Sequence, residues 1–310
     1  MTVSAYLLDW LQAKAPDLET STLEAYRIYL GKHICPWFDA LGKELHELRP
    51  LDIRAYVTAK RNGGRCDGKK GGLSAVSVRK HLNIIKQALR EAVLYELIPT
   101  NPAEPVRLPR SQELSPEAKF IPLADARAII RAFQGHRLHP LVLVTLYYGL
   151  RRSEVLGLKW GAVDFKLKEL RITSTVVKNV TIVEKDRVKT PSSRRTFPLL
   201  PEVAEQLRSL RPRKCSPDAY VFHREDGTPL RPDSVTRGFQ RVLRAHGLPR
   251  MRFHDLRHAT ASILFDKGWS VADVQHWLGH SDIETTMNIY VAYNSTRKMR
   301  IGGALDGLFT

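Results

Sequence analysis

The chain has few cysteines and no long apolar run, and both absences narrow the classes of protein to which it can belong. Its three cysteines, Cys35, Cys66 and Cys215, lie far apart in 310 residues and form no Cys-x-x-Cys pair. A zinc ribbon or a disulfide-based fold is therefore not expected, and a reducing, cytoplasmic compartment fits. The longest apolar stretch, residues 140–150, is too short to span a bilayer, so no membrane is expected as a partner.

Acidic residues are outnumbered by basic ones. The chain has 49 lysines and arginines against 32 aspartates and glutamates, which gives a formal net charge of +17 and a pI of about 9.9. The excess is present in both halves of the sequence, so it does not reside in one tail. A basic surface of this size attracts polyanions and predicts a nucleic acid as the partner.

The apolar pattern predicts a mainly α-helical protein with a small antiparallel β-sheet. Residues 1–102 are expected to form a helical domain with helices over 3–13, 20–38, 50–61 and 74–97. Six prolines within 99–122, without apolar periodicity, predict a linker, which we place at 103–120. For the second domain, 121–310, we expect helices over 123–133, 140–149, 151–158, 232–246, 254–267, 271–278 and 283–290. A β-hairpin is expected from 170–177 and 180–184, with further strands at 195–199 and 219–223.

Several basic side chains are candidates for contacts with a nucleic-acid backbone. The loop 62–72 is rich in glycine and lysine, and it could be a solvated connection or a segment that settles on phosphates. Two lysines lie off the apolar face of the helix 74–97, and two arginines end a basic turn before the strand 195–199. The predicted DNA-binding residues are Arg65, Lys69, Lys70, Lys80, Lys86, Arg194 and Arg195.

Cleavage of a phosphodiester by a side-chain hydroxyl needs a nucleophile, fixed cations for the oxygens of the phosphate, and a donor that protonates the leaving oxygen. The chain offers a tyrosine, Tyr290, ten residues after His280. Arg257 follows His254 by three residues, which places both on one face of a predicted helix. Arg151 comes two residues after a glycine that ends an apolar helix, and Lys189 lies in a basic turn.

Each candidate taken alone also has a plainer interpretation. Arg151 and Glu154 could form a surface ion pair, Lys189 could be a solvated lysine, and Tyr290 could pack in the core. The histidines at 254 and 258, and those at 276 and 280, have a spacing that could hold a metal ion. However, an arginine within the first pair would repel a cation, and no His-Glu-x-x-His motif is present. We therefore expect neither a metal ion nor a cofactor.

The order of these residues resembles the tyrosine recombinase (phage integrase) family over nearly the whole chain. The family's boxes are matched in sequence by Gly149-Leu150-Arg151-Arg152-Ser153-Glu154, by Lys189-Thr190 with Arg194-Arg195-Thr196-Phe197-Pro198-Leu199, by His254-Asp255-Leu256-Arg257, by Leu278-Gly279-His280 and by Tyr290. The N-terminal helices resemble the family's core-binding (SAM-like) domain, and the second domain resembles its catalytic domain.

The resemblance implies a site-specific DNA recombinase that needs neither metal nor ATP. Tyr290 would attack the scissile phosphate, form a 3′-phosphotyrosine link and release a 5′-hydroxyl. The phosphate would be held and protons moved by Arg151, Arg257, Lys189, His254 and His280, with Lys189 protonating the leaving 5′ oxygen and Glu154 orienting Arg151. The implied partners are a duplex core site with inverted repeats, three further copies of the chain, and accessory proteins that bend DNA or set direction.

Several alternatives stay open. Tyr293 is a rival nucleophile, although the spacing from His280 favours Tyr290. The apolar residues after Tyr290 could dock on a neighbouring subunit or pack on their own domain. Many family members carry an additional N-terminal arm-binding domain, which this protein either lacks or has lost from this chain. The role could be integration and excision of a mobile element or resolution of chromosome or plasmid dimers. A type IB topoisomerase and a catalytically inactive DNA-binding protein are the rival classes.

Overall fold

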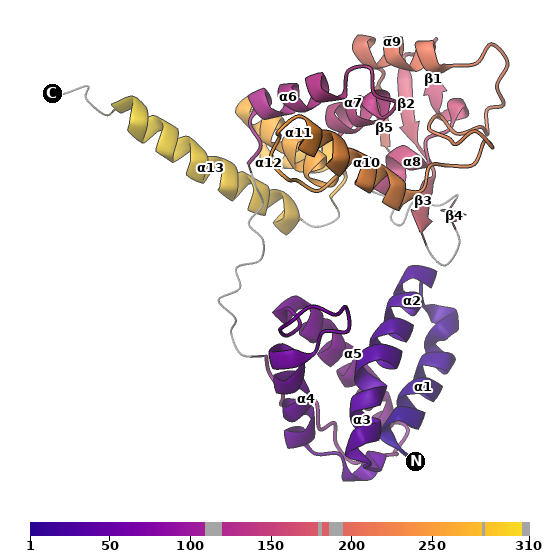
Figure 1. The fold of residues 1–310 in the computed structure, drawn as a ribbon, viewed down its shortest axis with the longest axis vertical. Coiled ribbons are helices and arrows are strands. Elements are labelled where there is room, and N and C mark those ends of the chain that lie inside the picture. The colour runs from indigo at the N-terminus through magenta and orange to yellow at the C-terminus, as the bar shows by residue number, and fades with distance from the viewer. Residues whose placement is uncertain (109–119, 179–181, 186–194, 281–282, 306–310) are drawn as a thin grey trace. The chain divides into compact units, whose positions relative to one another are not determined.

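The computed structural model describes residues 1–108, 120–178, 182–185, 195–280 and 283–305 (Figure 1). The chain divides into two units, Met1–Ser115 and Pro116–Thr310, and each has its own hydrophobic core. Helices predominate in both units, which confirms the predicted fold class.

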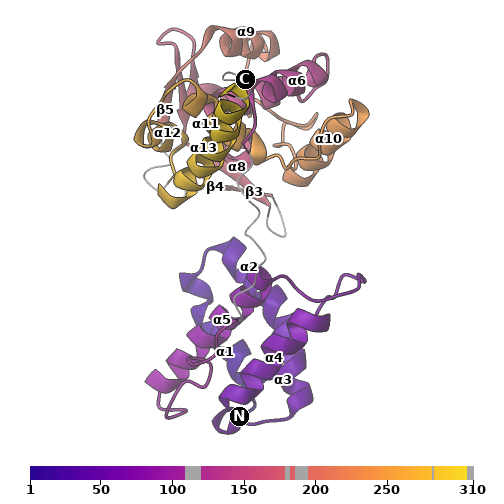
Figure 2. The ribbon, with the colours of Figure 1, turned by 90° about the vertical axis from the view of Figure 1, so that its left-hand side faces the viewer.

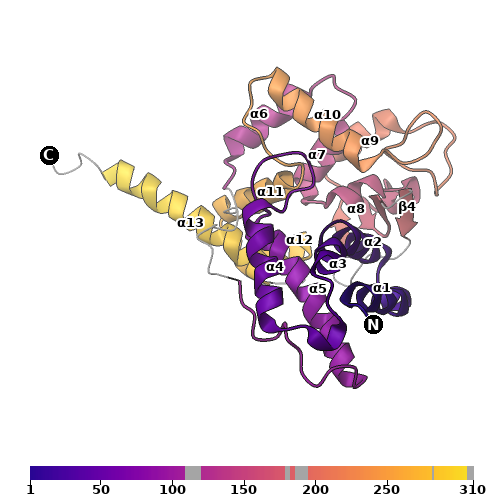
Figure 3. The ribbon, with the colours of Figure 1, turned by 60° about the horizontal axis from the view of Figure 1, so that its bottom comes forward.

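Unit 1 contains the α-helices α1 (Val3–Lys14), α2 (Thr20–Tyr29), α3 (Cys35–Leu41), α4 (Pro50–Gly63) and α5 (Ala75–Leu94). Helix α5 begins where the Ser74 hydroxyl accepts a hydrogen bond from the Ser77 backbone N–H at 3.2 Å. Its predicted apolar face is buried, and α4 and α5 lie side by side (Figure 3). The helix predicted over 20–38 is divided by a π-helical turn, Leu30–Ile34, and continues to Leu41.

The segment after α5 belongs to unit 1, so the linker predicted from residue 103 begins later than expected. Ala103 and Val106 are buried in the core of unit 1. The Asn101 side chain donates to the Lys86 carbonyl oxygen at 3.1 Å and accepts from the Ala103 backbone N–H at 2.9 Å. Two small apolar residues fill the core without forming a periodic pattern, which is why the sequence did not indicate them. The remainder of the expected linker, 109–119, lies outside the described residues.

Unit 2 carries the helices α6 (Leu123–Phe133), α7 (His139–Tyr148), α8 (Arg152–Leu156), α9 (Pro201–Leu210), α10 (Pro232–Ala245), α11 (Asp255–Asp266), α12 (Val271–Leu278) and α13 (Ile283–Leu305). Helix α7 is apolar on nearly all sides and is buried, as predicted. Helix α9 was not predicted, and only Val203, Ala204 and Leu207 bury against the core along it. Among the described residues no helix is both long and apolar enough to cross a membrane.

In the described part of unit 2 the strands form two small antiparallel sheets, where the sequence predicted one. Strand β2 (Glu169–Ile172) lies between β1 (Val163–Asp164) and β5 (Arg195–Pro198), and β3 (Thr175–Lys178) pairs with β4 (Ile182–Lys185). The single strand predicted over 170–177 is therefore two strands. The chain changes sheets at Ser174, whose hydroxyl donates to the Gly157 carbonyl oxygen at 2.6 Å. The strand predicted at 219–223 contributes only isolated bridges, because its partners are short loop segments.

Helix α13 is longer than the predicted 283–290. Its first turns pack on α11 and α12, where Ile289 and Tyr293 are buried (Figure 2). Its later turns project away from the rest of unit 2 (Figures 1 and 3). A docking role was left open for the apolar residues at 301, 305, 308 and 309, and the last two of these lie outside the described residues.

Candidate active site

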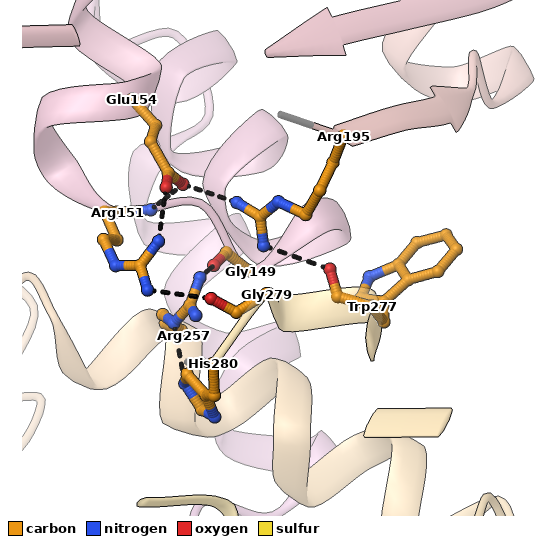
Figure 4. A network of polar contacts seen from close by, with 8 residues as sticks. All are labelled: Gly149, Arg151, Glu154, Arg195, Arg257, Trp277, Gly279 and His280. Carbon is orange, nitrogen blue, oxygen red and sulfur yellow. Dashed lines mark hydrogen bonds and ion pairs between the residues drawn. The ribbon is translucent and has the colours of Figure 1, made fainter. Parts of the chain in front are cut away.

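Two helices of unit 2 end at glycines whose carbonyl oxygens each accept a hydrogen bond from an arginine (Figure 4). Helix α7 ends at Gly149 with φ of 61°, and α12 ends at Gly279 with φ of 64°. Both need glycine for this left-handed conformation, and a Cβ at Gly149 would also collide with Leu278. Arg257 donates from Nη1 to the Gly149 oxygen at 2.7 Å, and Arg151 donates from Nη2 to the Gly279 oxygen at 2.9 Å. The two helix ends therefore bring both arginines to one place.

Glu154 joins Arg151 to a third arginine, Arg195. Its carboxylate, on a side chain that is 1% exposed, accepts from Arg151 Nη1 at 2.6 Å and from Arg195 Nη2 at 2.7 Å. It also accepts from the Arg151 backbone N–H at 2.8 Å. Burial raises the pKa of Glu154, but Arg195, Arg151 and this backbone N–H together outweigh it, so the pKa lies below its ordinary value. The predicted supporting residue is thus placed to orient Arg151.

The position of Arg195 corrects the prediction that this residue contacts DNA. Its side chain is only 8% exposed, and besides Glu154 it donates to the Trp277 carbonyl oxygen at 3.2 Å. The guanidinium also lies over the Phe197 ring, 5.4 Å from its centroid. A buried carboxylate requires a buried cation, and β5 directs Arg195 inward to supply it. A basic run in the sequence cannot distinguish this inward arginine from a surface one.

A hydrogen-bond chain leads from Arg257 through His280 to Thr286. Arg257 is 1% exposed and donates from Nε to His280 Nε2 at 3.1 Å. A guanidinium can only donate, so Nε2 must accept, and the imidazole proton is assigned to Nδ1. Nδ1 lies 2.7 Å from Thr286 Oγ1, which therefore accepts from it. Burial, together with Arg257 and Arg151, lowers the pKa of His280 to about 3, which agrees with a neutral ring.

The cluster carries an excess of positive charge. Three guanidiniums, those of Arg151, Arg195 and Arg257, surround the single carboxylate of Glu154. Burial and the nearby Arg151 lower the pKa of Arg257 to about 9, which still leaves it protonated at neutral pH. Its Nη2 is buried and has no hydrogen-bond partner among the described residues. Two uncompensated charges and an unused guanidinium donor suit an anion with several oxygens.

His254 stands beside this cluster at the start of α11. The residue is exposed, and its ring contacts that of His258 with centroids 5.2 Å apart. Partial removal of the ring from water, and then the neighbouring His258 and Arg257, lower the pKa of His254. It is therefore a neutral imidazole at physiological pH, able to donate one hydrogen bond or accept one. Among the described residues, no group of three or more His, Cys, Asp or Glu side chains could hold a metal ion.

Tyr290 lies on α13, one helical turn after Thr286, and is half-buried. Its ring packs on Phe265 with centroids 5.1 Å apart, and its hydroxyl has no hydrogen-bond partner among the described residues. Tyr293 is more deeply buried, at 6% exposure, between Phe265 and Phe120. The structure therefore assembles both arginines with His280, but it does not bond Tyr290 to them.

The remaining predicted residues are scattered. Lys189 and Arg194 lie outside the described residues. In unit 1 the side chains of Lys69, Lys70 and Lys80 are exposed, as contacts with a polyanion require. The other two predicted DNA-binding residues of unit 1 are partly engaged, since Arg65 pairs with Asp67 and Lys86 donates to the Glu104 carbonyl oxygen at 3.1 Å.

Thr286 is the functional candidate that sequence reasoning missed. Thr285 and Thr286 are identical neighbours in the sequence, so nothing in the sequence indicates which of them has a function. Only the packing of α13 shows that Thr285 is exposed whereas Thr286 is fully buried.

Residues 119–297, more than half of the chain, match the phage integrase family. The chain belongs to this family. A tyrosine recombinase XerC-like protein of Caldanaerobacter subterraneus subsp. tengcongensis is 30% identical over 295 residues, which cover 86% of this chain and 73% of the relative. The ICEBs1 integrase of Bacillus subtilis is 26% identical, over 94% of this chain and 79% of the relative. This phage integrase family member is accordingly a tyrosine-type site-specific recombinase.

Solved structures show the same fold. A Tn1549 transposon integrase in complex with transposon right end DNA has a TM-score of 0.75 at 19% identity, and the match covers 100% of both chains. A lambda integrase tetramer bound to a Holliday junction has a TM-score of 0.67 at 18% identity, covering 93% of this chain and 77% of that one. The two-domain architecture of this recombinase is therefore that of the integrases.

Proposed function

We propose that this recombinase cleaves and rejoins duplex DNA through a 3′-phosphotyrosine at Tyr290, with Arg151 and Arg257 holding the scissile phosphate. The observation that carries the proposal is the cationic cluster, in which three arginines surround one carboxylate and leave two positive charges uncompensated. A phosphodiester carries one negative charge, and attack by a tyrosine oxygen brings a second to the transition state. The charge of the cluster thus matches the transition state better than the substrate.

The proposed step balances without a cofactor. The Tyr290 hydroxyl gives its proton to the neutral imidazole of His254 as its oxygen forms a bond to phosphorus. The bond from phosphorus to the 5′ oxygen breaks, and Lys189 gives that oxygen a proton. The new ester retains the energy of the broken one, so the reverse attack by a 5′-hydroxyl rejoins the strand without ATP. His254 is proposed to donate a hydrogen bond to the phosphate from its position beside the arginines. Because Tyr290 now packs on Phe265, its ring must move toward the phosphate when DNA binds.

The test is a nicked substrate that traps the covalent intermediate. Tyr290→Phe removes only the hydroxyl, so we expect it to bind DNA normally and to form no adduct. Tyr293→Phe is the matched control, since it removes the hydroxyl of the neighbouring tyrosine on α13, and it should still form the adduct. If the adduct persists in Tyr290→Phe and disappears in Tyr293→Phe, the nucleophile is Tyr293 and the proposal is wrong.

We further propose that four copies of the chain bind a duplex core site with inverted repeats. The exposed Lys69, Lys70 and Lys80 would contact its phosphates. Accessory proteins that bend DNA or set direction would assist. The Tn1549 and lambda integrases, described in complexes with DNA, support duplex DNA, and the lambda tetramer supports four copies. The ICEBs1 integrase and the Tn1549 transposon integrase favour integration and excision of a mobile element. The XerC-like relative favours dimer resolution as the second candidate. Recombination between attachment sites on two plasmids, compared with resolution of a plasmid dimer, separates the two roles.

A further inference from the structure

Thr286 ends a buried chain of hydrogen bonds that reaches the candidate phosphate-binding arginine. Its side chain is fully buried, and Oγ1 lies 2.7 Å from His280 Nδ1. His280 Nε2 lies 3.1 Å from Arg257 Nε, and Arg257 Nη1 lies 2.7 Å from the Gly149 carbonyl oxygen. Arg257, His280 and Thr286 are each at most 9% exposed, so water offers little competition for these hydrogen bonds.

The Arg257 end determines the direction of every bond in the chain. Because Nε of Arg257 donates, His280 must present a lone pair on Nε2 and its proton on Nδ1, where the Thr286 hydroxyl accepts it. Without that hydroxyl, Nδ1–H would be a buried donor without a partner. The alternative tautomer would place an Nε2–H group against the Nε–H group of Arg257, and two donors in contact would push the guanidinium out of position.

Thr286 and Tyr290 lie four residues apart on α13, so they face the same side of that helix. Helix α13 therefore carries the proposed nucleophile, Tyr290, and also supplies the Thr286 hydroxyl that accepts the hydrogen bond from His280. We propose that Thr286 is a positioning residue that couples the docking of α13 to the orientation of Arg257. This inference rests on the proposed function and adds a requirement to it: Arg257 is held ready for the phosphate only when α13 is seated.

The same geometry gives His280 a role different from the one implied by the family resemblance. In this tautomer its Nε2 has no proton to donate to a phosphate oxygen and is already occupied by Arg257. His280 thus acts on the phosphate through Arg257.

The experiment compares three variants of the full chain, Thr286→Val, Thr286→Ser and Thr285→Val. Valine matches threonine in shape but has no hydroxyl, serine keeps the hydroxyl, and the exposed neighbouring threonine provides the matched control. One readout is the nitrogen-15 chemical shifts of the His280 imidazole, which identify its tautomer. The other is the rate of covalent trapping on a nicked substrate at saturating DNA.

We expect wild type to show a protonated Nδ1 and an unprotonated Nε2. Thr286→Val should lose this pattern and trap DNA roughly tenfold to a hundredfold more slowly, as expected when a buried donor loses its partner. Thr286→Ser should restore both readouts, and Thr285→Val should match wild type in both.

Two results would overturn the inference. One is a protonated Nε2 in wild type, which needs no variant and therefore stands even if Thr286→Val does not fold. The other is a Thr286→Val protein that keeps the wild-type tautomer and trapping rate. If wild type itself never traps DNA, the proposed function fails, while the imidazole shifts still decide whether Thr286 fixes His280.

Discussion

Replacing Glu154 by glutamine tests whether the cationic cluster depends on one buried carboxylate. The substitution keeps the shape but leaves Arg195, on a side chain that is 8% exposed, without a counter-charge, and places an amide N–H₂ group against a guanidinium donor. Removal of one partner from a buried ion pair costs about 3–5 kcal/mol. Arg151 is 32% exposed and can turn to water, so most of this cost arises at Arg195, and we expect a loss near the lower limit, about 3 kcal/mol. That is a large share of the roughly 5–15 kcal/mol that stabilises a typical domain.

The assay is chemical denaturation, with unit 2 followed separately by hydrogen exchange of the amides in α7 and α11. Glu225→Gln, an exposed carboxylate in the same unit, is the control and should change the free energy of unfolding by no more than about 0.5 kcal/mol. The pKa of Glu154 is lowered in the folded state, so its contribution is present above the unfolded pKa of about 4.3 and is lost as pH falls through the lower folded pKa. A Glu154→Gln protein as stable as wild type at pH 7 would refute the reasoning.

Three further outcomes follow from the same geometry. Gly149→Ala should destabilise unit 2 more than Gly135→Ala in thermal unfolding. Both positions have positive φ, but only at Gly149 would the new Cβ collide with Leu278. Equal losses of stability would contradict this packing. In an NMR titration His280 should stay neutral at pH 5, because its folded pKa is lowered to about 3. Between pH 6.5, the ordinary pKa of an unfolded histidine, and about 3, only the unfolded state binds the proton, so the free energy of unfolding should fall as the pH drops through this range. A ring that titrates near 6.5 would contradict its burial. Lys80→Gln should weaken binding of all duplexes alike and reduce the slope of log K against log salt by about one, whereas an unchanged slope would remove this lysine from the interface.

Helix bounds, the excess of basic charge and the family could be predicted from the sequence, because each depends on composition, on apolar spacing or on the order of short motifs. The helix over Leu123–Phe133 has the bounds that its apolar spacing predicts, and α7 is buried as its composition requires. The excess of basic charge predicted a polyanionic partner, and the order of the boxes around Arg151, Arg257, His280 and Tyr290 indicated the family that the comparisons show. Those features depend on residues close together in the chain or on their order along it.

The interior of the site was decided by tertiary contacts alone. Arg257 bonds a carbonyl oxygen 108 residues away, and Arg151 bonds one 128 residues away. Arg195 resembles any basic residue of a surface turn until the burial of Glu154 makes it a counter-charge. Thr286 differs from Thr285 only in the direction it faces on α13. Whether a polar side chain points into the protein or into water depends on which distant groups can pair with it, and only the folded chain brings those groups together.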